Sequence, residues 1–223
     1  MSTGKMSKHD MKEDKFVTTM FQGASIAKDN LRGVILIVVV LVAFVAGIVI
    51  IKSYTSNRKE TAQKTLGIAQ IAYKAGNFVE ARDSLLSLTE KYPKSKSAKI
   101  GNFLLGHIYF ASGSPDSAEI YWKAFLESKF QDPEMIVAAK AGLAGVKADK
   151  GDYKTAALEL ESLYNENPDF FDKADLLYKA AINFKAAGER EKTKELLKKF
   201  IDEYPDSPLV VKAKFFLSAA EAV

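Results

Sequence analysis

The chain has 223 residues, with 32 Lys and Arg against 28 Asp and Glu and no cysteine. This length allows one or two domains with a sizeable core, and the lack of cysteine excludes disulfide bonds, thiolate metal sites and a cysteine nucleophile. Residues 1–59 carry nine basic and four acidic side chains, a net charge of +5, whereas residues 60–223 carry 23 and 24, a net charge of −1. The larger part therefore lacks the clustered basic charge that nucleic-acid binding requires.

Residues 1–32 form a charged segment that we expect to be a partly disordered cytoplasmic tail. Apolar side chains recur near helical spacing between Phe16 and Leu31, with basic residues beside them. This pattern suits either a short helix lying on the inner membrane leaflet or a helical lead-in to a membrane span.

Residues 33–51 contain no charged or strongly polar side chain, and Arg32 and Lys52 border them. Because a helix of this length extends roughly 28 Å, the segment predicts a single transmembrane helix rather than a buried core helix. A cleaved signal peptide fits poorly, since the charged segment ahead of the apolar run is too long.

Basic residues flank the expected span on both sides, so they give conflicting signals for its orientation. We expect the N-terminus in the cytoplasm and the C-terminal domain on the other side of the membrane, because a first span usually follows its N-terminal charge and large following domains cross regardless of charge. The basic residues after the span favour the opposite orientation. The two sets are Lys5, Lys8, Lys12, Lys15, Lys28 and Arg32 before the span, and Lys52, Arg58, Lys59 and Lys64 after it.

Residues 52–61 are predicted to form a juxtamembrane linker, and residues 62–223 a repeat domain. Glycines recur there at intervals of 37, 38 and 37 residues, and a small residue follows each glycine five places later. Large apolar residues follow at helical spacing, which predicts two amphipathic helices per repeat. The repeat-defining residues are Gly76, Ala81, Gly113, Ala118, Gly151, Ala156, Gly188 and Thr193. We therefore expect an all-α chain with one N-terminal transmembrane helix, a four-repeat α-solenoid and a C-terminal capping helix over residues 209–223.

Helix ends are marked in the same units. Each glycine lies where a first helix stops, a position that favours left-handed backbone geometry. Ser114 and Asp132 each precede a proline, as is typical of helix N-termini. Prolines after the second helices of three units predict their ends.

These residues resemble the tetratricopeptide repeat family, although Lys147 replaces the usual aromatic in the third unit and Thr193 the usual alanine in the fourth. The tail, single span and four repeats together are similar to the bacterial ancillary SecYEG translocon subunit family. That resemblance implies an inner-membrane protein with periplasmic repeats, whose partners are the translocon and periplasmic chaperones or clients.

No catalytic or ligand-binding motif is recognisable, and the chain has only two histidines, His9 and His107. A histidine-based metal site or catalytic triad therefore cannot be assembled. We expect no enzyme activity, no cofactor and no metal, with His107 an ordinary half-buried residue.

The first helices of such a solenoid would line a groove that binds apolar or extended polypeptides, since aromatic side chains offer contact area at low entropic cost. Each aromatic could equally pack between neighbouring helices. The candidate groove residues are Gln70, Tyr73, Lys74, Phe103, His107, Phe110, Asp149, Tyr178, Ile182, Lys185 and Phe215.

The sequence thus predicts a membrane-anchored protein-interaction scaffold that assists secreted clients or partner assembly at the Sec translocon. Two alternatives remain open at this point. One is a scaffold for cell-wall synthesis or outer-membrane assembly. The other is a ligand-sensing membrane regulator, although the short tail carries no enzymatic domain.

Overall fold

The computed structural model describes residues 31–130 and 132–221. The expected tail lies outside this part of the chain, apart from Leu31 and Arg32. The described residues form nine α-helices and no strand, which confirms the all-α fold class.

Helix α2 (Leu31–Lys74) contains both the predicted span and residues 52–61, so the segment expected to be a linker is helical. No residue in its most apolar 18-residue window is buried, and its length and composition would allow it to cross a membrane. The chain divides into two compact units between Asn57 and Arg58. The limits of anchor and repeat domain stay a prediction.

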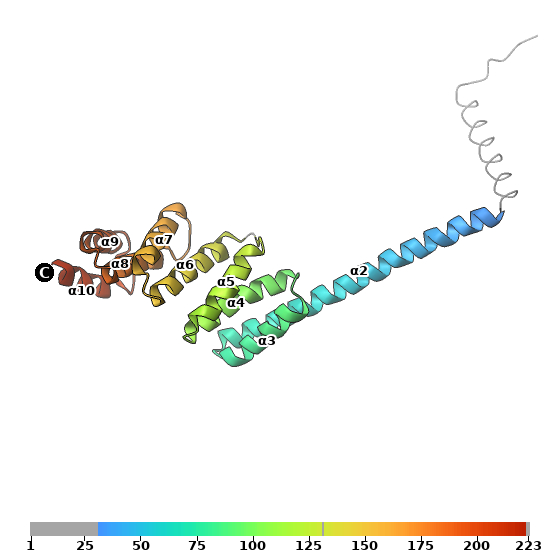
Figure 1. The fold of residues 1–223 in the computed structure, drawn as a ribbon, viewed down its shortest axis with the longest axis horizontal. Coiled ribbons are helices and arrows are strands. Elements are labelled where there is room, and N and C mark those ends of the chain that lie inside the picture. Colours follow the sequence, from blue (N-terminus) through green and yellow to red (C-terminus); the bar gives the residue numbers. More distant parts are fainter. Residues whose placement is uncertain (1–30, 131, 222–223) are drawn as a thin grey trace, which may run out of the picture. The chain divides into compact units, whose positions relative to one another are not determined.

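Eight further helices follow in antiparallel pairs that contact one another in chain order (Figure 1). The helices are α3 (Phe78–Lys91), α4 (Lys96–Ala111), α5 (Pro115–Glu127), α6 (Pro133–Asp149), α7 (Tyr153–Glu166), α8 (Lys173–Ala186), α9 (Arg190–Glu203) and α10 (Val210–Glu221). The first and second helices are the C-terminal part of α2 with α3 in unit one, α4 with α5 in unit two, α6 with α7 in unit three and α8 with α9 in unit four; α10 follows the fourth unit.

The turn inside each repeat depends on its glycine. Gly76, Gly113, Gly151 and Gly188 have φ angles of 80°, 73°, 87° and 78°. Other residues adopt this left-handed region at a steric cost, whereas glycine lacks the Cβ that causes it. The glycine therefore lets the chain reverse between the two helices of a unit within a few residues.

The other helix ends combine caps and prolines. The Asp132 carboxylate accepts a hydrogen bond from the Met135 backbone N–H at 3.1 Å, which caps α6. Ser114 precedes Pro115 at the start of α5 but makes no side-chain cap bond. Helices α3, α7 and α9 end shortly before a proline, which lacks the N–H that a helix interior needs.

The core lies between the helices rather than in one central layer. The small residues of the second helices, Ala81, Ala118, Ala156 and Thr193, are completely buried. Leu85, Phe125, Leu160 and Phe200, on the same four helices, are at most 1% exposed. Small residues let neighbouring helices approach closely while large ones fill the remaining space, so each repeat is stabilised mainly by its neighbours.

Candidate functional site

The predicted groove depends on the first helices of successive units sharing one face. Helix α4 contacts α6 directly, across the intervening helix of unit two. The Lys179 charge on α8 lowers the pKa of His107 on α4, so Lys179 lies near His107 although unit three separates the two residues in the sequence. The first helices of units two to four therefore contribute to a common surface.

An aromatic cluster occupies the middle of this surface. On α4, the rings of Phe103 and His107 lie 4.6 Å apart, centroid to centroid, in an edge-to-face arrangement. His107 and Phe110 lie 5.2 Å and 5.6 Å from the ring of Trp122 on α5. All three α4 side chains are half-buried, so each keeps an accessible part while packing against the second helix. They can thus support the fold and still offer apolar contact area.

Two glycines make room for Trp122. A Cβ atom on Gly106 of α4 would lie 2.4 Å from the indole Nε1, and one on Gly142 of α6 would lie 2.6 Å from Cη2. Trp122 is 1% exposed, and its Nε1–H has no hydrogen-bond partner among the described residues. The ring fills a slot between the first helices of units two and three. Because His107 and Phe110 pack against this ring, the slot also fixes the position of the aromatic cluster.

His107 is a neutral aromatic residue at physiological pH. Burial, together with a smaller effect of the nearby Lys179 charge, lowers the pKa of His107 from 6.5 to about 4. A neutral imidazole adds no positive charge to the surface, so the middle of the groove is apolar and weakly polar rather than cationic.

The aromatic groove candidates outside unit two do not join the cluster on α4. Tyr73 and Tyr178 contact second-helix residues Phe78 and Phe200, at ring distances of 5.5 Å and 5.4 Å. Phe215 on α10 is 67% exposed. The structure therefore concentrates the candidates of unit two and spreads the others along the solenoid.

The remaining candidates are polar or small contributors. Gln70 and Ile182 are half-buried, whereas Lys74, Asp149 and Lys185 are exposed. Lys185 lies with its Nζ 4.8 Å from the ring centroid of Phe216, so it contacts α10. The binding role of the whole set stays a prediction.

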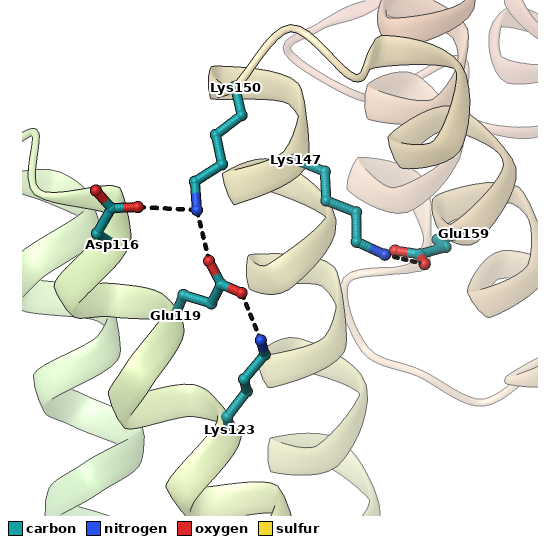
Figure 2. A network of polar contacts seen from close by, with 6 residues as sticks. All are labelled: Asp116, Glu119, Lys123, Lys147, Lys150 and Glu159. Carbon is teal, nitrogen blue, oxygen red and sulfur yellow. Dashed lines mark hydrogen bonds and ion pairs between the residues drawn. The ribbon is translucent and has the colours of Figure 1, made fainter.

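Sequence reasoning missed a hollow, which we name the α6 cleft. It has a volume of about 530 Å³ and lies along α6 with α5 and α7 beside it. On the α5 side, Lys150 pairs with Asp116 at 2.8 Å and with Glu119 at 2.6 Å (Figure 2). Glu119 also pairs with Lys123 at 2.5 Å, and the hydrogen bonds from Lys123 and Lys150 lower its pKa to about 2.

On the α7 side of the α6 cleft, Lys147 pairs with Glu159 (Figure 2). Lys147 stands where this repeat pattern usually has an aromatic residue. That departure is the one sequence signal that could have drawn attention to the cleft, because an aromatic side chain at this position could not form the ion pair.

The described residues contain no group of three or more His, Asp or Glu side chains that could hold a metal ion. The surfaces described above offer apolar contact area, hydrogen bonds and charge. These are means of non-covalent binding.

Comparison with known families gives two adjacent matches. Residues 27–174 match the family described as "Tetratricopeptide repeat-like domain", and residues 175–207 match "Tetratricopeptide repeat". The first match spans more than half of the chain. No curated protein is similar enough in sequence to count as a match.

Solved structures show the same fold at low sequence identity. MamA RS-1, a double mutant, has a TM-score of 0.59 and 19% identity, covering 72% of this chain and 83% of its own. PilF of Pseudomonas aeruginosa has a TM-score of 0.58 and 16% identity, covering 74% and 71%. Another MamA structure has a TM-score of 0.55 and 20% identity, covering 73% and 87%. At these identities the likeness concerns the fold alone.

Proposed function

Since the chain belongs to the tetratricopeptide repeat-like domain family, we propose that it is a membrane-anchored protein-interaction scaffold that works without catalysis. The observation that carries this proposal is the aromatic cluster of Phe103, His107 and Phe110 on the shared first-helix face. Half-buried aromatic rings held by a fixed neighbour lose little entropy on binding, so they suit a polypeptide partner.

In this proposal, residues 33–51 cross the inner membrane and hold the repeats on the periplasmic side. The bilayer then restricts scaffold and membrane partner to one surface, which raises their effective concentration for each other. The partners are the SecYEG translocon together with periplasmic chaperones or secreted clients. This identification of the partners is supported by the order of tail, span and repeats, in which the chain resembles the ancillary SecYEG translocon subunit family.

The first experiment fixes the side of the membrane. Trypsin is added to cells whose outer membrane alone has been opened, and the repeat domain is followed with a C-terminal tag. Digestion under these conditions supports the periplasmic arrangement. Protection until the inner membrane is breached would place the repeats in the cytoplasm and end the translocon proposal, while leaving a tethered scaffold.

The second experiment identifies the partner through the groove. A photo-crosslinking amino acid replaces Lys74 or Asp149, both exposed candidates, in the full-length chain in cells. Matched control positions are the exposed Lys94 and Glu195, which the groove prediction does not include. Crosslinks to translocon subunits from the groove positions only would support the proposal. Crosslinks to wall-synthesis or outer-membrane assembly proteins instead would identify a different scaffold, and equal labelling from all four positions would refute the groove.

A further inference from the structure

The α6 cleft combines an apolar floor with a charged rim. Among its lining residues, Leu143 and Val146 come from α6 and Leu163 from α7. The other lining residues are polar or charged: Glu119, Lys123, Lys140, Lys147, Lys150, Glu159, Ser162 and Glu166. A ligand in this cleft would therefore meet a small aliphatic area surrounded by hydrogen-bonding groups.

Three of the four lysines in the lining are neutralised inside the protein. Lys123 and Lys150 pair with carboxylates of α5, and Lys147 pairs with Glu159 of α7. The Lys140 side chain is exposed and forms no ion pair or hydrogen bond with any residue in the described ranges. It is thus the cation of the lining that remains available to a ligand.

Each of the three carboxylates in the lining already has a partner within the protein, unlike the four lysines, of which Lys140 has none among the described residues. Glu119 and Glu159 pair with lysines, as described above, and the Ser162 hydroxyl donates a hydrogen bond to Glu166 at 2.5 Å. An incoming anion therefore finds a free ammonium group at Lys140, whereas an incoming cation finds only Glu166, already a hydrogen-bond acceptor. The charge arrangement favours a ligand with a carboxylate.

We propose that the α6 cleft binds a short peptide segment of a protein partner, with an aliphatic side chain over Leu143 and Leu163 and a neighbouring carboxylate at Lys140. A cleft of about 530 Å³ is in the range that holds a few residues. The mixed rim offers donors and acceptors to a peptide backbone, whereas an acyl chain would require a more continuous apolar lining than these three residues provide. This site goes beyond the proposed first-helix groove, because second helices α5 and α7 form its sides.

The test uses the full-length chain in nanodiscs, with ¹³C-labelled leucine and valine methyl groups observed by NMR. Two probes are titrated: the peptide acetyl-Leu-Glu-Leu-amide and its neutral counterpart acetyl-Leu-Gln-Leu-amide. We expect saturable shifts at Leu143, Val146 and Leu163, with a Kd for the glutamate peptide about two- to fivefold lower than for the glutamine peptide. That ratio corresponds to one exposed ion pair.

Lys140→Gln should abolish the difference between the two peptides, because it replaces the free ammonium group with a neutral polar amide. Lys94→Gln is the matched control, since Lys94 is also exposed but lies outside the cleft, and it should leave the difference unchanged. Phe103→Ser, in the first-helix groove, should also leave the difference intact, which separates this site from the proposed function.

Three results would overturn the inference. The first is equal affinity for both peptides, and the second is a difference that persists in Lys140→Gln. The third is the absence of saturable peptide shifts while vesicles of phosphatidylglycerol shift the same methyl groups, since this would make the occupant a lipid.

Discussion

The slot that holds Trp122 allows a sharp test of the packing between repeats. Gly106→Ala adds one Cβ atom that would lie 2.4 Å from the indole Nε1, against at least 3.4 Å for ordinary contact. The ring cannot move away freely, because Gly142 of α6 lies against its opposite edge, where a Cβ atom would be 2.6 Å from Cη2. The substitution must therefore displace a helix or strain the ring.

Two opposing effects set the size of this change. Alanine stabilises a helix interior by about 1 kcal/mol relative to glycine, whereas overpacking costs about 1–3 kcal/mol. Because the displacement needed at Gly106 is large for a van der Waals contact, we expect the upper part of that range and a net loss of about 1–2 kcal/mol. This loss lowers the Tm by roughly 2–8 °C for a chain of this size.

The assay is thermal unfolding of the full-length chain in detergent, followed by circular dichroism. Gly67→Ala in α2 is the matched control, since a Cβ atom there meets nothing within 4 Å and only the helix-propensity gain remains. We expect Gly67→Ala to raise the Tm slightly and Gly106→Ala to lower it. In a Trp122→Leu background the cost of Gly106→Ala should shrink. An equal rise in Tm for both glycine substitutions would refute the slot.

Three further results are expected. Because the pKa of His107 is about 4 in the folded chain and 6.5 unfolded, the unfolded chain binds more protons between these values, so stability falls by about 3 kcal/mol as pH drops through that interval. His107→Gln should flatten this part of the pH profile from chemical denaturation; an unchanged profile would contradict the burial. Ala118→Leu and Ala156→Leu should each lower the Tm through overpacking of about 1–3 kcal/mol, and two unchanged midpoints would mean the repeat register is wrong. Tyr164→Phe removes the hydroxyl that donates a hydrogen bond to Glu203 across α7 and α9, and should cost about 1 kcal/mol in urea titration; no loss would show that this bond adds nothing.

Local patterns were sufficient to predict the fold class. The glycine spacing, the small residues of the second helices and the prolines are short-range signals, because each acts on backbone geometry or on the face of a single helix. The apolar run over residues 33–51 is equally local, since it depends on composition and length alone. The sequence left open whether the helix continues through residues 52–61, because a polar, charged segment suits either a linker or a helix that continues from its neighbour.

The candidate groove was predicted only as a set of positions. Helical register placed Phe103, His107 and Phe110 on one face, but it could not say that His107 and Phe110 pack against Trp122 or that burial keeps His107 neutral. The register also put Phe215 in the same set, although it is mostly exposed on α10.

What the sequence by itself determined is therefore the repeat, its turns, its small and large core positions and a segment able to cross a membrane. Only the tertiary structure decided which glycines form the Trp122 slot, and that the Lys140 side chain has no partner among the described residues while the other lysines of the α6 cleft pair with carboxylates. The physical reason is that both features depend on side chains from different helices meeting at atomic distances. Helical periodicity assigns a residue to a face, but the partner on the facing helix follows from how the repeats pack.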